Sequence, residues 1–174
     1  RKPKNKLLKE VEVSGYAAEG KSLAKIDGKV YFIEGAVPGD VVDLMLSKNK
    51  KDWAEGKAVH FHRYSENRVD PFCKHFGICG GCKWQMLPYE KQLEYKQQEV
   101  VQNLRRIGKI ELPEMMPIMG SDLTKYYRNK LEFTFSNRKY LTREEMNIDI
   151  EEEAGTTEKK DTPALGFHVP RIFD

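Results

Sequence analysis

The strongest constraint on the fold is a series of short strand patterns near the N-terminal end, separated by tight turns and lacking any helical period. Residues 10–14 alternate apolar and polar side chains, and Asp27-Gly28 separates two apolar-rich runs as a hairpin turn does. Because exposed sheet edges promote aggregation, short strands of this kind favour a small closed barrel. We therefore predict an oligonucleotide-binding (OB) type of barrel over residues 7–64. Its five expected strands cover residues 10–14, 22–27, 29–34, 41–47 and 56–62.

The segment after the cysteines predicts one amphipathic helix. Pro88 is suited to the first helical position, and Gly108 is suited to a C-terminal stop. Apolar residues recur between them at spacings of seven, four and three, which places them on one face of a helix. The helix is expected to extend through about Ile107, and its apolar residues are Leu93, Val100, Leu104 and Ile107.

The C-terminal part predicts the beginning of an antiparallel sheet. Residues 127–136 alternate cleanly, and residues 164–169 are expected to pair with them. Two strands alone are marginally stable, so they should belong to a larger sheet. The predicted fold class is mainly β with α+β. Its parts are a basic tail at 1–6, the barrel at 7–64, a cysteine loop and helix at 65–110, and an incomplete sheet domain at 118–174.

Composition excludes several classes of protein. The 174 residues are 39% hydrophobic and 33% charged, a mixture typical of globular domains. No apolar run approaches the roughly 18 residues of a membrane helix, and no secretory signal is visible, so we expect a cytoplasmic protein without a membrane partner. The net charge of +3 has its basic excess in the barrel and cysteine regions. That excess makes nucleic acid a candidate partner, although ordinary solvated surface explains it equally well.

The cysteines form a compact C-x5-C-x2-C motif. Their odd number is a poor basis for disulfides, and their clustering argues against three unrelated buried thiols. Two thiolates with two residues between them can bind one metal centre, and Gly80-Gly81 supplies the backbone freedom that this requires. Zinc with His75 as the fourth ligand and an iron–sulfur cluster with a distant fourth cysteine are both compatible, though His75 is closer in sequence than zinc ligands usually are. The candidate ligands are Cys73, Cys79 and Cys82.

Around this motif the sequence resembles the RNA (uracil-5-)-methyltransferase family, particularly its 23S ribosomal RNA members. Residues 73–85, with the Cys-Gly-Gly-Cys run at their centre, are similar to the family's cluster-binding segment. Residues 20–28 and the turn at 37–40 are similar to its TRAM domain, an OB-like RNA-binding module. Residues 127–130 and 165–167 are similar to the start of its central RNA-binding domain. The resemblance therefore covers nearly the whole chain.

This resemblance implies an S-adenosylmethionine-dependent enzyme that adds a cysteine to C6 of uracil, transfers a methyl group to C5 and removes the C5 proton. It also implies a [4Fe–4S] cluster on Cys73, Cys79 and Cys82. Two features depart from the family: no cysteine follows Cys82 to complete the cluster, and no glycine-rich turn could cradle a nucleoside cofactor. We therefore expect the N-terminal part of such an enzyme, inactive alone, with its catalytic residues beyond Asp174.

The barrel is the expected source of RNA-binding energy. A uracil must be extruded before it can react, and the cost of unstacking has to be met by contacts elsewhere in the RNA. Basic and aromatic side chains suit single-stranded RNA, although Phe32 is compatible with the barrel core and the C-terminal candidates with a solvated face. We expect a monomer that binds RNA, with 23S ribosomal RNA as the first candidate, through Lys21, Lys25, Tyr31, Trp53, Arg128 and Lys130.

The same motifs are compatible with two alternative functions. The first is a non-catalytic RNA-binding module that holds zinc or a cluster, and the truncated C-terminal sheet argues against it. The second is a TRAM-bearing radical enzyme. Such enzymes place a C-x3-C-x2-C motif before their barrel, whereas this chain has C-x5-C-x2-C after it.

Overall fold

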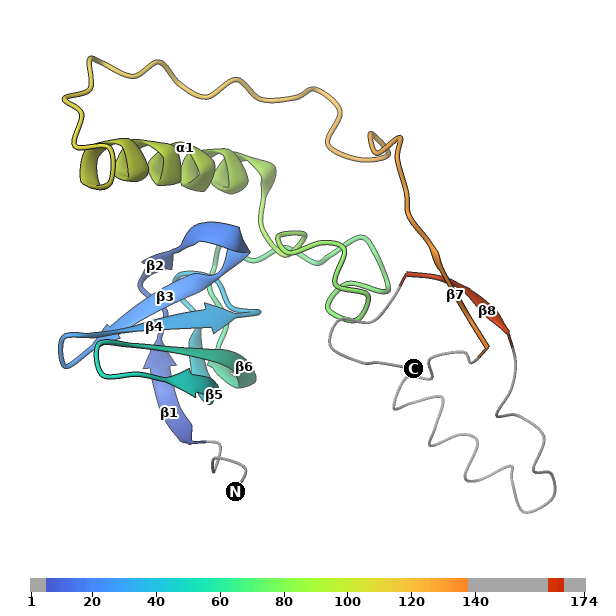
Figure 1. The fold of residues 1–174 in the computed structure, drawn as a ribbon, viewed down its shortest axis with the longest axis horizontal. Helices are drawn as coiled ribbons and strands as arrows, with labels where there is room; N and C mark the ends of the chain where they lie inside the picture. The colour runs from blue at the N-terminus through green and yellow to red at the C-terminus, as the bar shows by residue number, and fades with distance from the viewer. Residues whose placement is uncertain (1–5, 138–162, 168–174) are drawn as a thin grey trace. The chain divides into compact units, whose positions relative to one another are not determined.

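The computed structural model describes residues 6–137 and 163–167 (Figure 1). These residues form two compact units. The first contains the described residues up to Lys74 together with Lys83–Thr124, and the second contains His75–Cys82 and the described residues from Lys125 onward. Within these ranges no helix has the length and apolar character needed to cross a membrane. Most of the predicted basic tail lies outside the described residues.

The first unit is built on one sheet of six strands in the order β1-β5-β6-β4-β3-β2. Neighbouring strands are antiparallel except β4 and β6, which run parallel. All five predicted strands are present, and the additional β2 is too short to show a sequence period. The strands are β1 (Leu7–Glu12), β2 (Gly15–Tyr16), β3 (Ser22–Ile26), β4 (Lys29–Glu34), β5 (Val41–Asn49) and β6 (Trp53–Arg63), and the short helix η1 (Ala18–Gly20) follows β2.

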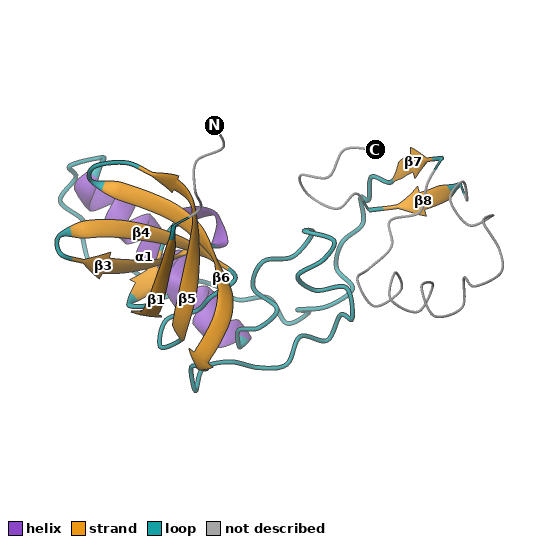
Figure 2. Ribbon diagram, turned by 90° about the horizontal axis from the view of Figure 1, so that it is seen from below, coloured by secondary structure: helices purple, strands orange, loops and turns teal. Residues whose placement is uncertain are grey.

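The two edge strands of this sheet are consecutive pieces of one chain segment. Between β1 and β2, the Val13 N–H donates to the Asp40 carbonyl and the Ser14 N–H donates to the Leu23 carbonyl, each at 2.9 Å. A sheet whose first and last strands are continuous in this way must curl around its core (Figure 2). The predicted OB-like barrel is therefore confirmed, with its edges held together by residues 7–16.

Alternate residues of the strands fill the barrel, as their sequence pattern predicts. Ile33 on β4 and Leu44 on β5 are completely buried. Small residues on β6 let the neighbouring strands approach closely: a Cβ added to Gly56 would lie 2.5 Å from the carbonyl oxygen of Met45. The buried core consists of Val11, Val13, Ala24, Ile33, Ala36, Val42, Leu44, Leu46, Ala54 and Ala58.

Helix α1 (Tyr89–Arg106) confirms the predicted helix almost residue for residue. Pro88 precedes its first turn, and the Gly108 N–H donates to the Asn103 carbonyl at 3.0 Å to close its last. The predicted apolar face is unevenly covered within the described part of the chain: Leu93 and Leu104 are half-buried, whereas Val100 and Ile107 are 52% and 79% exposed. The opposite face of the helix lies toward β2 and η1 (Figure 1).

The second unit contains one antiparallel strand pair, β7 (Thr134–Ser136) and β8 (Ala164–Gly166). Phe135 pairs with Leu165 at the centre of the register, so the predicted pairing of residues 127–136 with residues 164–169 is confirmed over three residues of each. Phe133 and Phe167 pack just outside the pair, with ring centroids 5.1 Å apart. The last two residues of the predicted second strand lie outside the described ranges.

Candidate nucleic-acid interface and cysteine loop

The outer face of strands β3, β4 and β6 carries an aromatic pair. The register sets Val30 opposite Trp53, so Phe32, two residues further along β4, lies on the same face as Trp53. Their ring centroids are 6.3 Å apart at an interplanar angle of 68°, and Trp53 is 36% exposed. Exposed aromatic rings on a sheet are suited to stacking against unpaired bases.

Lysines lie around this aromatic pair, and one carboxylate forms ion pairs with two of them. Glu55 lies opposite Phe32 in the register. Its Oε1 is 2.7 Å from Nζ of Lys21, and its Oε2 is 2.8 Å from Nζ of Lys48. The hydrogen bond from Lys21 and then that from Lys48 lower the pKa of Glu55 to about 2. Lys25 is exposed on the same face and has no ion pair among the described residues.

Tyr31 lies on the inner face of β4. It is paired with Ala24 on one side and Ala54 on the other, and its ring packs against the buried core. Nζ of Lys29 lies 5.6 Å from the ring centroid. Strand alternation correctly indicated that Tyr31 and Phe32 face opposite sides. In the structure Phe32, not Tyr31, lies on the outer face beside Trp53.

The two predicted contacts of the C-terminal part, Arg128 and Lys130, belong to the second unit. The Arg128 Nε–H donates to the Lys130 carbonyl at 3.1 Å. The Lys130 ammonium is 3.3 Å from the Glu132 carboxylate, and both of these side chains are 84% exposed. They lie ahead of β7, outside regular structure.

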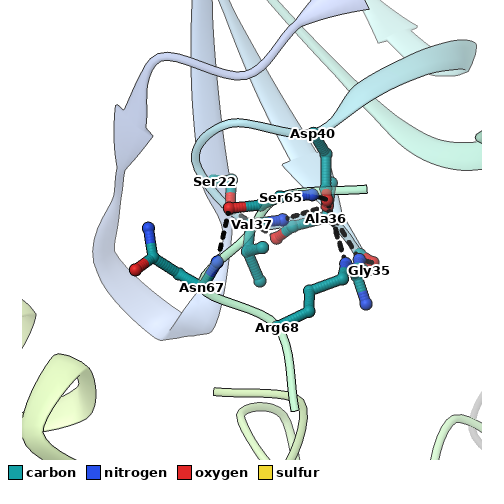
Figure 3. A network of polar contacts seen from close by, with 8 residues as sticks. All are labelled: Ser22, Gly35, Ala36, Val37, Asp40, Ser65, Asn67 and Arg68. Carbon is teal, nitrogen blue, oxygen red and sulfur yellow. Dashed lines mark hydrogen bonds and ion pairs between the residues drawn. The ribbon is translucent and has the colours of Figure 1, made fainter. Parts of the chain in front are cut away.

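A buried carboxylate that sequence reasoning missed fixes the loop after β6 to the barrel (Figure 3). Asp40 is completely buried and accepts hydrogen bonds from the backbone N–H groups of Val37 at 2.7 Å and Ser65 at 2.8 Å. Arg68 donates to both of its oxygens, through Nε at 2.9 Å and Nη2 at 2.7 Å. The predicted turn at residues 37–40 is therefore also an anchoring point for the chain that leads to the cysteines.

The remaining contacts of Arg68 explain why the loop takes this path. Its Nη2 also donates to the Gly35 carbonyl at 3.2 Å. Its guanidinium lies 4.9 Å from the Phe61 ring centroid and 5.2 Å from that of Tyr64. Cation–π contact of this kind suits a planar guanidinium better than an ammonium group. No local sequence signal links Arg68 to a carboxylate 28 residues earlier.

All three cysteines are free thiols. In the second unit, the N–H groups of Ile78 and Cys79 donate to the His75 carbonyl at 3.1 and 3.2 Å. Gly77 and Gly80 have φ values of +82° and +68°, which a residue with a side chain rarely adopts. The sequence had indicated the glycine requirement at Gly80 but not at Gly77.

Cys73 belongs to the first unit, where its N–H donates to the side-chain oxygen of Gln85 at 3.2 Å. In the described ranges, no three His, Cys, Asp or Glu side chains are gathered closely enough to hold a metal ion. The donor chemistry of three thiols nevertheless suits a soft metal centre or an iron–sulfur cluster.

Comparison with known proteins identifies relatives of the chain. Residues 8–59 match the family model of the TRAM domain. The chain is 54% identical over 158 residues to a protein of Bacteroides thetaiotaomicron named as an uncharacterized RNA methyltransferase, and the match covers 91% of this chain and 33% of that protein. A protein of the same name from Porphyromonas gingivalis is 46% identical over 164 residues, which cover 94% and 34% of the two chains.

A third relative is named for a specific reaction. It is the 23S rRNA (uracil(1939)-C(5))-methyltransferase RlmD of Francisella tularensis subsp. novicida. It is 38% identical over 122 residues, which cover 70% of this chain and 27% of that protein. The chain thus spans about a third of the length of the relatives that it matches.

Proposed function

Because residues 8–59 are a TRAM domain in a chain homologous to proteins named RNA methyltransferases, we propose that this chain is the RNA-binding part of an RNA methyltransferase. The relative named RlmD supports a narrower proposal, in which the enzyme methylates C5 of a uridine in 23S ribosomal RNA and uses S-adenosylmethionine. We assign the methyl-transfer chemistry to sequence outside this chain, which spans about a third of its relatives. The homology is the observation that carries the proposal.

The outer face of the barrel supplies RNA affinity in this proposal. Phe32 and Trp53 present aromatic surface, and Lys21, Lys25 and Lys48 surround it with positive charge. Each stacked base contributes roughly 1–3 kcal/mol. Energy of that size, gained away from the reacting base, offsets the few kcal/mol needed to unstack a uracil for attack at its C6.

We also propose that Cys73, Cys79 and Cys82 supply three thiolate ligands to a [4Fe–4S] cluster whose fourth ligand comes from outside this chain. The free thiols and the tight glycine turns of the loop support this assignment. Methyl transfer from S-adenosylmethionine to carbon requires no electron transfer, so the role proposed for the cluster is to cross-link the loop. Within the chain, Gln85 orients Cys73 through its backbone N–H.

Substitution of Trp53 in the full-length protein tests the function. We expect W53A to weaken binding of a single-stranded 23S ribosomal RNA segment by about tenfold, because one stacking surface is lost. Val59 is an exposed residue of the same strand that has no ring, so V59A is the matched control and should bind like the wild type. Radiolabelled methyl transfer to 23S ribosomal RNA tests the reaction.

Two outcomes would contradict the proposal. Equal RNA affinity of the W53A and V59A variants would show that the outer face of the barrel does not bind RNA. RNA binding by the full-length protein without any methyl transfer from S-adenosylmethionine would favour the non-catalytic module.

A further inference from the structure

A cavity of about 180 Å³ lies between the start of the barrel and α1, on the helix face opposite the exposed apolar residues. It is contained entirely in the first unit. One wall is formed by β2, η1 and β3, and the other by α1 from Tyr95 to Asn103 together with Trp84 from the loop before the helix. The residues that matter for its chemistry are Tyr16, Trp84, Tyr95, Glu99, Gln102 and Asn103.

Three aromatic rings form the apolar part of the cavity wall. The centroids of Tyr16 and Tyr95 are 4.0 Å apart at 42°, and those of Tyr16 and Trp84 are 5.5 Å apart at 74°. The rings therefore support one another and need little reordering when a ligand enters. Burial raises the pKa of both tyrosines, so their rings stay neutral at physiological pH. Trp84 Nε1 is buried and has no hydrogen-bond partner among the described residues.

The polar part of the wall contains three amides and the Glu99 carboxylate, and two of the amides are uncommitted; the third, Gln98, donates to Glu94 at 3.1 Å. Helix α1 carries other amide side chains that are already engaged: Gln92 donates to the Trp84 and Leu87 carbonyls, and Gln97 bonds the backbone of the segment after the helix. In contrast, the side chains of Gln102 and Asn103 make no hydrogen bond within the described part of the chain. A carboxamide presents a donor and an acceptor in one plane, which matches the edge of a nucleobase.

We propose that this cavity binds one unstacked base of the RNA substrate. The inference rests on the proposed RNA-methyltransferase function but concerns a site separate from the outer sheet face. Aromatic rings combined with planar hydrogen-bonding groups are how proteins recognise unpaired bases. The Glu99 carboxylate, an acceptor only, favours a base with an exocyclic amino group.

Positive charge beside the cavity supports an RNA ligand. Lys83 is fixed next to η1, because its ammonium donates to the Glu19 carbonyl at 2.8 Å. Arg106 lies one helical turn beyond Gln102 and is exposed. An apolar peptide would leave the amides and Glu99 without partners, so an RNA base with flanking phosphates is the better match.

The test compares two probes that share a backbone. One is a single-stranded 12-nucleotide oligocytidylate, and the other is an oligonucleotide of the same length whose central nucleotides lack bases. In the full-length protein, we expect the Q102A/N103A double variant to lose about tenfold in affinity for the first probe and to leave the second unchanged. A18L, which fills the cavity from an exposed position, should give the same pattern.

The controls separate this site from the proposed function. N67A removes an exposed amide outside the cavity and should bind both probes like the wild type. Circular dichroism checks that each variant keeps its helix.

Wild-type affinity of the cavity variants for oligocytidylate would overturn the inference, leave RNA binding by the barrel intact and point to a protein segment as the occupant. Equal losses for both probes would also overturn it, because backbone contact alone would then account for the effect. Failure of the wild type to bind either probe would overturn the inference, and failure to bind the 23S ribosomal RNA segment as well would overturn the RNA-binding function itself.

Discussion

Asp40 shows how much of this structure depends on one buried charge. It joins the turn before β5 to the loop after β6 through two backbone N–H groups and Arg68. The sequence predicted the turn from its Pro-Gly-Asp run, but the partners of the carboxylate are not local in sequence. They become neighbours only when the barrel forms, so no motif could have identified them.

Removing this carboxylate should strongly destabilise the folded barrel. We expect D40A to lower the free energy of unfolding by about 3–5 kcal/mol, because Arg68 and two N–H groups lose their acceptor in a buried site. Urea denaturation measures the change. D52A is the matched control, since Asp52 is exposed and its side chain makes no ion pair among the described residues; its effect should stay within about 0.5 kcal/mol. Equal effects of the two substitutions would contradict the role given to Asp40.

Gly56 allows a second prediction at the residue scale. In G56A the added methyl group would lie 2.5 Å from the Met45 carbonyl oxygen and 2.8 Å from a Leu44 methyl carbon, and the backbone of β5 cannot yield cheaply. We expect a loss of about 1–3 kcal/mol, visible as a lower melting temperature. Gly15 also lies in the sheet, but its nearest contact would be an ordinary 3.5 Å to Leu23, so G15A should have a much smaller effect. A melting temperature for G56A as high as that of G15A would contradict the predicted clash.

At the scale of elements, period and turn chemistry were sufficient to predict most strands and α1. They could not predict which face of each element points toward its neighbours. The alternation of side chains along a strand predicts that Tyr31 and Phe32 face opposite sides of the sheet. Only the parallel pairing of β4 with β6 shows which of them lies beside Trp53. Likewise, the apolar period correctly predicts α1, but the helix face that lies toward the barrel carries the aromatic and amide side chains.

Glu55 on β6 is paired with Lys48 on β5 and with Lys21 just before β3, and these ion pairs should make the stability of the barrel depend on pH. Its pKa is lowered from 4.5 to about 2 in the fold, so its stabilising contribution is complete above about pH 4.5 and is lost as the pH falls toward 2. We expect E55Q to flatten the dependence of melting temperature on pH across this interval. E66Q changes an exposed glutamate with no ion pair in the described ranges and should leave the curve unchanged. Identical curves for the wild type and E55Q would show that the ion pairs of Glu55 do not cause the pH dependence of stability.

For the whole molecule, the cysteine motif and the TRAM pattern were sufficient to indicate the family resemblance from sequence. The cavity beside α1 was not predictable, because its residues come from segments about 80 positions apart. The cysteine ligands remain a prediction. We expect C79S in the full-length protein to abolish bound iron, measured by elemental analysis, whereas H75A should retain it. Zinc in place of iron, or loss of metal in H75A, would favour the zinc site.

The continuity of β1 and β2 has a consequence for synthesis on the ribosome. Residues 7–12 emerge before their pairing partner β5, which begins at Val41, and the parallel neighbour of β4 begins only at Trp53. At roughly 5–20 residues per second, β1 therefore waits for seconds before it has a partner. During that interval the nascent chain exposes an unpaired apolar strand, and the hairpin of β3 and β4 is the first part that can form from local contacts. Barrel closure is thus expected to follow the release of residue 63 from the exit tunnel, which makes the folding of this domain a late event relative to the appearance of its first strand.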